Sequence, residues 1–268
     1  MQLKNKISRL KKIILESGSC LVAFSGGTDS AFLLKSASLG LPKSKIMAVT
    51  ANSATYPKEE LLSARRFCRR LGLRHKIINT RELNNEKFCA NPPQRCYFCK
   101  RELFTRLKKI AQKNKLNFVF DASNISDKSD FRPGERAKKE LRVRSPLQEA
   151  GLTKAEIRIL SRKSGLNTWD KPSQACLASR IPYGVRISKP VLERVNQAEG
   201  VLRRLNFSQV RVRHYNGLCR IEVPKKEIIR LIHKRQSIVD KFKKLGYNYI
   251  ALDLAGYRTG SLNEVIKR

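Results

Sequence analysis

The chain has 268 residues and a formal net charge of +35, because 57 Lys and Arg residues stand against 22 Asp and Glu residues. Hydrophobic residues make up 41 %, which indicates a globular chain and excludes a disordered one. No apolar run approaches the ~18 residues that a membrane span needs, and the basic start 1–12 lacks the apolar region of a signal peptide. We therefore expect a cytoplasmic protein, away from membranes, that favours anionic partners.

The first part of the chain alternates helices and strands. Apolar residues at helical spacing predict a helix over 2–16, and the apolar run 20–25 predicts a buried strand that a helix follows after Asp29. Strands alternating with helices at this spacing indicate βαβ units and a parallel sheet. The further strands are predicted over 45–51, 75–79 and 117–121, and the further helices over 57–71 (opened by Pro57), 98–113 and 153–165 (opened by a capping box from Thr153 to Glu156).

Polar loops follow three of these strands, and Ser145-Pro146-Leu147 breaks the pattern later in the chain. Ligands of a parallel sheet bind beyond the carboxyl ends of its strands. Loops 25–30 and 52–56 would both lie there, the second against adenine and ribose. In loop 122–134, Asp127 and Asp130 are candidates for binding magnesium or ribose, although loop aspartates commonly only cap turns.

The last hundred residues have a different pattern. Residues 169–184 are irregular and hold Pro172, and we place a domain boundary here. The order that follows is α-β-β-α-β, which predicts a small antiparallel α+β domain. The predicted domains are 1–168 and 169–268, and the elements of the second are a helix over 188–205, strands over 209–214 and 220–223, helical segments over 224–245 and a strand over 247–253.

The most informative loop is Ser25-Gly26-Gly27-Thr28-Asp29-Ser30, between the first strand and its helix. A helix start exposes unpaired N–H groups and the positive end of a dipole, which suits a phosphate. The two glycines let the backbone approach an anion closely. A plainer interpretation is an ordinary strand-to-helix turn capped by Ser25 or Asp29.

This loop resembles the SGGxDS loop of the PP-loop ATP pyrophosphatase superfamily, whose members split ATP to AMP and pyrophosphate. It is neither a Walker A loop nor a GxGxxG fingerprint. The resemblance implies an α/β fold of the adenine nucleotide alpha hydrolase type, with helices on both faces of a parallel sheet. It also implies that Asp29 binds Mg²⁺, and that ATP is bound by Ala23, Phe24, Ser25, Gly26, Gly27, Asp29, Ser30 and Thr50.

Seven cysteines, an odd number, argue against a disulfide framework. Cys20, Cys68 and Cys219 have apolar or helical surroundings and are interpreted as core residues, whereas Cys89 lies in a predicted loop and fits either interpretation.

Cys96-x-x-Cys99 has the spacing of zinc sites, redox pairs and iron–sulfur clusters. A zinc site normally requires a second pair of Cys or His ligands at short spacing, and the three histidines of this chain are scattered. A redox-active pair of cysteines remains an alternative. Cys176 lies in a polar, proline-rich stretch that is a poor place for a core cysteine, and Arg180 nearby would favour its thiolate.

Three further motifs resemble the LarE family of ATP-dependent sulfur transferases, which build the nickel-pincer nucleotide cofactor of lactate racemase. They are Pro-Pro-x-Arg-Cys-Tyr-x-Cys-Lys at 92–100, Ser-Pro-Leu-x-Glu-x-Gly-Leu-Thr-Lys at 145–154 and Ala-Cys-Leu-Ala-Ser-Arg-Ile-Pro-Tyr-Gly at 175–184. The resemblance implies that ATP adenylates a carboxylate of pyridinium-3,5-biscarboxylic acid mononucleotide, and that sulfur then replaces AMP to give a thiocarboxylate.

The family has two branches. One sacrifices the sulfur of a single cysteine at the place of Cys176, and the other holds a [4Fe–4S] cluster on three cysteines at the places of Cys96, Cys99 and Cys176. Because this chain has all three, the cluster branch is our hypothesis. The family also implies a homo-oligomer and leaves the sulfide donor unnamed.

Several basic residues are candidates for binding anionic groups of the substrate. Arg180, Arg211 and Arg213 are candidates for its phosphate or second carboxylate, with ordinary surface charge as the alternative. Lys100, directly after Cys99, is a weaker phosphate candidate.

Two other functions are weighed. The net charge of +35 would suit a PP-loop enzyme that thiolates tRNA, but the sequence has no appended RNA-binding module. A non-catalytic nucleic-acid-binding protein with a vestigial loop is disfavoured because the loop 25–30 is intact. Since basic residues are spread along the whole chain, a source with a basic proteome, or a solvated basic surface, explains the charge slightly better than a nucleic-acid partner does.

Overall fold

The computed structural model describes residues 2–56, 59–129, 133–171 and 175–266. It consists of two compact units, the first formed by residues 1–53, 57–82 and 94–174, the second by 54–56, 83–93 and 175–268. The second unit thus includes two segments that precede the predicted boundary after residue 168. Pro57, Asp130 and Pro172, which the sequence analysis singles out, lie outside the described residues.

The first unit is a parallel α/β sheet, as predicted. Its described strands are β1 (Cys20–Ala23), β2 (Ile46–Asn52), β3 (Arg74–Asn79) and β4 (Phe118–Phe120). Its described helices are α1 (Leu3–Ser17), α2 (Thr28–Gly40), α3 (Glu59–Leu71), α5 (Arg95–Lys113), α6 (Gly134–Glu140), α7 (Pro146–Glu149) and α8 (Lys154–Lys163).

The strand order is β3-β2-β1-β4, with every pair parallel. Cys20 is in register with Ile46 of β2 on one side and with Phe118 of β4 on the other. The loops after β1, β2 and β4 therefore leave the sheet at the same edge, which is where ligands of such sheets bind.

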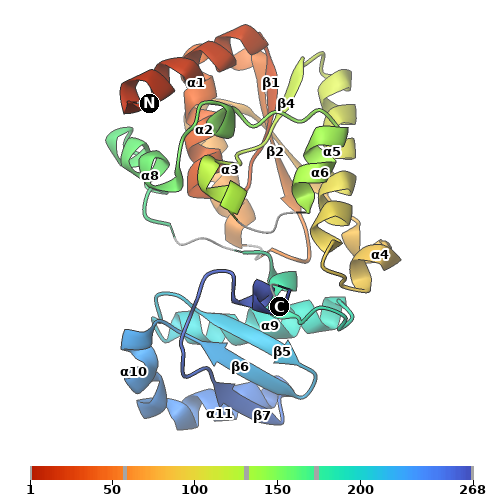
Figure 1. Cartoon of the computed structure of the whole chain (residues 1–268), viewed down its shortest axis with the longest axis vertical. Coiled ribbons are helices and arrows are strands. Elements are labelled where there is room, and N and C mark those ends of the chain that lie inside the picture. The colour runs from red at the N-terminus through yellow and green to blue at the C-terminus, as the bar shows by residue number, and fades with distance from the viewer. Residues whose placement is uncertain (1, 57–58, 130–132, 172–174, 267–268) are drawn as a thin grey trace. The chain divides into compact units, whose positions relative to one another are not determined.

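Side chains of β1 alternate between two hydrophobic cores, and these cores lie on opposite faces of the sheet. Cys20 and Val22 pack with residues of α1, α2, α3 and α8. Leu21 packs on the other face with residues of α5 and α6. Figure 1 shows the sheet between these two layers of helices. Burial on both faces explains why β1 reads as a continuous apolar run.

Two short helices correct the sequence analysis. Ser145-Pro146-Leu147 was expected to break the pattern, but Pro146 begins α7, where its missing N–H is tolerated. Cys89 was expected in a loop, but it ends α4 (Glu86–Cys89) in the second unit and is buried. The side chain of Asn85 accepts a hydrogen bond from the N–H of Lys87 and caps this one-turn helix.

The second unit has a three-stranded sheet in the order β5-β6-β7. β5 and β6 are antiparallel, but β7 runs parallel to β6, so the expectation of an antiparallel domain is wrong for its last strand. The two helices between β6 and β7 return the chain to the end where β6 began. The elements are α9 (Lys189–Arg204), β5 (Arg211–Tyr215), β6 (Leu218–Glu222), α10 (Ile228–His233), α11 (Arg235–Lys244) and β7 (Tyr249–Leu252).

The predicted capping box at the start of α8 is present and links two helices. Glu156 accepts hydrogen bonds from the N–H of Thr153 at 2.8 Å and from Lys6 of α1 at 2.7 Å. We expect Glu156→Ala to lower the free energy of unfolding by about 1–2 kcal/mol, because it removes the carboxylate half of the capping box and the ion pair with Lys6 together. Urea unfolding measures this loss.

Glu16→Ala is the matched control for this prediction. Glu16 lies 3.8 Å from Lys12 in a pair whose side chains are 59 % and 75 % exposed, and such pairs contribute little. Equal losses in the two variants would contradict the assigned role of Glu156.

Candidate functional site

The loop between β1 and α2 has the geometry of an anion-binding turn. Gly26 has a φ of +75°, a conformation that side-chain-bearing residues rarely adopt. Gly27 is the N-cap of α2, and no side chain in the described part of the chain caps this helix. The plainer interpretation, capping by Ser25 or Asp29, is therefore wrong. The first N–H groups of α2 are left to bind an anion.

Two hydroxyl groups hold this loop in shape. Ser25 Oγ and Ser30 Oγ lie 3.1 Å apart, and Ser30 Oγ also donates to the carbonyl of Gly27 at 3.1 Å. Thr28 Oγ1 donates to the carbonyl of Thr168 at 2.6 Å, which ties the loop to a segment distant in the sequence. The N–H groups of Ser25 and Gly27 also donate to these hydroxyls, at 3.3 Å and 3.4 Å, so the loop is ordered by its own side chains and the N–H groups that remain for a ligand are those at the start of α2.

Asp29 is held by a lysine that the sequence analysis did not name. Lys154 Nζ lies 2.8 Å and 2.7 Å from the two carboxylate oxygens of Asp29. Asn124 Nδ2 lies 3.5 Å from the second oxygen. Burial raises the pKa of Asp29, Lys154 opposes this, and the charge of Asp127 adds to it. Asp127 is thus near Asp29, on the loop after β4, as the parallel topology requires.

A second lysine, Lys171, contacts the loop from a segment that is distant in the sequence. Lys171 Nζ donates to the carbonyl of Gly26 at 3.3 Å and pairs with Glu60 of α3. For Lys154 the signal was its place in the motif 145–154, whereas nothing in the sequence marked Lys171.

Phe24 and Thr50 were also predicted to bind the nucleotide, but their side chains contact other protein side chains. The ring of Phe24 is buried with its centroid 5.3 Å from that of Phe67. Thr50 Oγ1 lies 2.8 Å from His75 Nε2, and burial lowers the pKa of that histidine. The Phe24 ring is therefore closed to a ligand, and the Phe24 N–H donates to the carbonyl of Val49 at 2.8 Å.

The two cysteines of the C-x-x-C motif lie at the start of α5, which begins at Arg95, earlier than predicted. Cys96 is exposed and Cys99 is half-buried. Lys100 Nζ lies 5.0 Å from the centroid of the Phe104 ring. Among the described residues, no three His, Cys, Asp or Glu side chains are gathered as around a metal ion.

Cys176 belongs to the second unit, where it is the N-cap of a 3₁₀ turn over Leu177–Arg180. Arg180 Nη1 donates to the carbonyl of Cys176 at 3.0 Å and to that of Ala175 at 2.7 Å. The N–H and the hydroxyl of Ser179 also donate to the Cys176 carbonyl. The backbone at this half-buried cysteine is therefore fixed from three directions.

The three candidate arginines are buried, so ordinary surface charge does not describe them. Arg180 forms a bidentate pair with Glu199, at 2.7 Å and 3.1 Å. Arg213 forms a similar pair with Glu222 and donates to the carbonyl of Ser179 at 2.6 Å. Burial, followed by the charge of Arg180, lowers the pKa of Arg211. Two of the three guanidinium groups therefore support the Cys176 turn.

Comparison with known proteins places the chain among proteins of its own length. No family model matches it. It is 41 % identical over 268 residues to an uncharacterized protein of Synechocystis, covering 99 % of this chain and 100 % of that one. It is 35 % identical to the pyridinium-3,5-bisthiocarboxylic acid mononucleotide synthase of Lactiplantibacillus plantarum, over 92 % of this chain and 90 % of the synthase. The chain belongs to the LarE family.

A third relative is more distant in sequence. An uncharacterized protein of Methanocaldococcus jannaschii is 29 % identical over 264 residues, covering 95 % of this LarE-family chain and 98 % of that protein. No helix in the described part of the chain combines the length and apolar character needed to cross a membrane.

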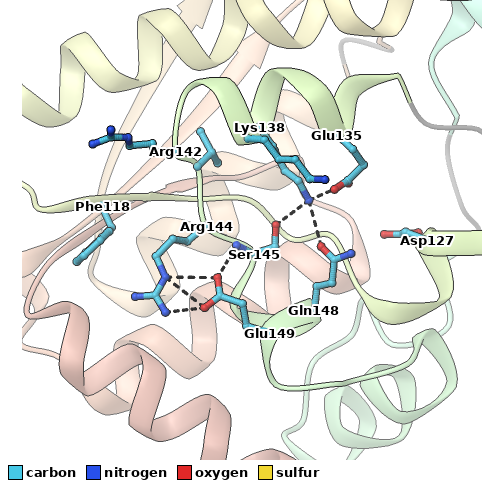
Figure 2. Close-up of a pocket in the computed structure, with 11 residues that line it drawn as sticks. Phe118, Asp127, Glu135, Lys138, Arg142, Arg144, Ser145, Gln148 and Glu149 are labelled. Atoms are coloured by element: carbon cyan, nitrogen blue, oxygen red, sulfur yellow. Dashed lines mark hydrogen bonds and ion pairs between the residues drawn. The ribbon is translucent and has the colours of Figure 1, made fainter.

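A pocket of about 810 Å³ in the first unit is lined mainly by residues of α6, α7 and the segment between them, with Phe118 of β4. Figure 2 shows the ammonium of Lys138 directed at Glu135, Ser145 and Gln148. Elsewhere in the pocket, Arg144 is paired with Glu149. Among the described residues that line this pocket, Asp127 is the one that the sequence analysis named as a candidate site residue. The lysine and Arg144 are thus held by neighbouring side chains.

The buried pairs of the second unit predict a large loss of stability on removing a carboxylate. Glu199→Gln leaves the Arg180 guanidinium without its counter-charge, so we expect the free energy of unfolding to fall by about 3 kcal/mol. The same change at Glu193, which is exposed on the same helix 3.9 Å from Lys189, should have almost no effect. Thermal unfolding of the two variants compares them; similar melting temperatures would contradict a role for the buried pair.

Proposed function

We propose that this LarE-family chain is an ATP-dependent sulfur transferase that converts a carboxylate of pyridinium-3,5-biscarboxylic acid mononucleotide to a thiocarboxylate, in the biosynthesis of a nickel-pincer nucleotide. The observation that carries the proposal is the 35 % identity to a named synthase of this product across both units of the chain. The loop of β1 and α2 supports it, because it leaves N–H groups free for a phosphate.

In the activation step, the loop would bind the phosphates of ATP. A substrate carboxylate oxygen attacks the α-phosphorus, the bond to the pyrophosphate oxygen breaks, and AMP stays on the carboxylate as a good leaving group. Asp29 and Asp127 supply carboxylate oxygens near each other, which are the ligands that Mg²⁺ prefers, so the residues fit this ion. Bound Mg²⁺ supplies charge neutralisation for the departing pyrophosphate.

In the sulfur step, we assign the ligands of a [4Fe–4S] cluster to Cys96, Cys99 and Cys176. The thiols fit this group, because thiolates are its ligands and Cys96 and Cys99 are one turn apart on α5 with solvent access. Three protein ligands leave one iron open, so the bound cluster supplies a site that carries sulfide. Arg180 and Arg213 would hold the backbone of Cys176 in position.

Arg211 is the strongest of the three arginines for binding an anionic group of the substrate. Arg180 and Arg213 are each held by a glutamate in a bidentate pair; burial, followed by the charge of Arg180 and opposed by that of Glu199, lowers the pKa of Arg211, which carries a buried positive charge. A phosphate or carboxylate of the substrate would balance this charge.

The activation step predicts that pyrophosphate release depends on the pyridinium substrate. We expect Asp29→Ala to lower this release at least about a hundredfold, because the Mg²⁺ that would neutralise the departing pyrophosphate loses a protein ligand. Asp240→Ala, an exposed aspartate on α11, is the control and should release pyrophosphate as the wild type does. Coupled assay of pyrophosphate measures both. Release stimulated by tRNA and not by the pyridinium substrate would instead favour a tRNA-thiolating enzyme.

The sulfur step predicts about four iron atoms per chain after anaerobic reconstitution. Cys96→Ala, Cys99→Ala and Cys176→Ala should each lose the cluster, whereas Cys68→Ala, a buried core cysteine, should retain it. Iron analysis and the visible absorption spectrum measure this. An iron-free protein that gains dehydroalanine at Cys176 in one turnover, detected by mass spectrometry, would replace the cluster by the sacrificial mechanism.

A further inference from the structure

Lys154 donates hydrogen bonds to both carboxylate oxygens of Asp29, the residue that would bind Mg²⁺ in the proposed reaction. Its Nζ lies 2.8 Å and 2.7 Å from the two oxygens of Asp29, and both side chains are partly buried, at 29 % and 22 % exposure. A divalent cation bound to Asp29 would need at least one of these oxygens. Two cations cannot share them without strong repulsion in a partly desolvated site.

The main chain at Lys154 is held by the structure around the start of α8, while its side chain is held at the ammonium group, by Asp29. Lys154 is the first residue of α8 and directly follows the N-cap Thr153, which forms a complete capping box with Glu156. Its N–H donates to Ser126 Oγ at 3.1 Å. The ammonium group, in contrast, stands on a four-carbon stem with rotatable bonds. The base of the side chain is therefore fixed near Asp29, and its charged end can move.

The position of this lysine also has an electrostatic cost. A cation in the first turn of a helix is disfavoured by the helix dipole, which favours acidic residues there. The ion pair with Asp29 offsets this cost, and so would any other anion placed beside the start of α8. The phosphates of ATP at the neighbouring loop are such an anion.

We infer that Lys154 is a positioning residue that exchanges partners during the reaction: it holds Asp29 until nucleotide and metal arrive together, and then transfers its ammonium to the phosphate oxygens. This rests on the proposed activation of a carboxylate by ATP. In that step the pyrophosphate leaves with the electron pair of its bond to the α-phosphorus and no proton is transferred. The ammonium of Lys154 would balance part of the charge on the leaving group.

The exchange predicts that the metal binds weakly to Asp29 in the absence of nucleotide. We expect Lys154→Met to tighten the binding of Mn²⁺ alone about tenfold, because it removes the competing cation. The same variant should weaken binding of α,β-methylene-ATP with Mg²⁺ about tenfold, because the phosphates lose a cationic partner. Electron paramagnetic resonance measures free Mn²⁺, and calorimetry measures the nucleotide.

Two variants serve as controls. Lys154→Arg keeps the charge and should bind Mn²⁺ alone as weakly as the wild type. Lys163→Met removes an exposed lysine at the end of the same helix and should leave both affinities unchanged. Urea unfolding of each variant checks that the fold is retained.

The outcomes separate this inference from the proposed function. If the wild type binds the ATP analogue with Mg²⁺ but Lys154→Met does not tighten Mn²⁺ binding, the exchange is wrong and the activation step stands. If tighter Mn²⁺ binding comes without weaker nucleotide binding, Lys154 is only a counter-ion of Asp29 and the exchange is again overturned. If the wild type binds no ATP analogue, the proposed function fails first.

Discussion

The hydrogen bonding of β1 to a parallel neighbour on each side is the constraint on which the first unit depends. Cys20 is aligned with Ile46 of β2 and with Phe118 of β4, so three loops leave the sheet at one edge. The loop before α2 brings Asp29 there, and the loop after β4 brings Asn124 and Asp127 to it. Had one of these strands been antiparallel, its loop would leave at the opposite edge, and the carboxylates would be far apart.

In each unit, buried or partly buried carboxylates are paired with basic side chains. The chain has 57 basic and 22 acidic residues, so carboxylates are the scarcer partner. Asp29, Glu199 and Glu222 are each bound by a basic side chain that is itself partly or fully buried. A buried carboxylate without such a partner would be strongly destabilising. In the first unit the partner is a lysine, whose four-carbon stem has rotatable bonds and suits exchange. In the second it is arginine, whose planar bidentate geometry suits a fixed support.

The sequence analysis predicted most elements of both units and failed where local patterns are weakest. The apolar periodicity of α1, the buried run of β1 and the capping box of α8 are confirmed, since each signal is carried by neighbouring residues. α4, α6 and α7 were missed because helices of one or two turns have little periodicity to detect. The direction of β7 was wrong because strand polarity depends on the connection across α10 and α11, and not on the strand's own residues.

The sequence by itself determined the chemical parts: a glycine loop that suits phosphate, three cysteines in two separate motifs, and membership of a family whose motifs extend over both units. It did so because these signals are residue types at short, fixed spacings. Only the tertiary structure decided what each side chain contacts. The pairing of Asp29 with Lys154, 125 residues away, and the burial of Arg180 against Glu199 depend on how helices pack, and long-range contacts of this kind leave no local pattern.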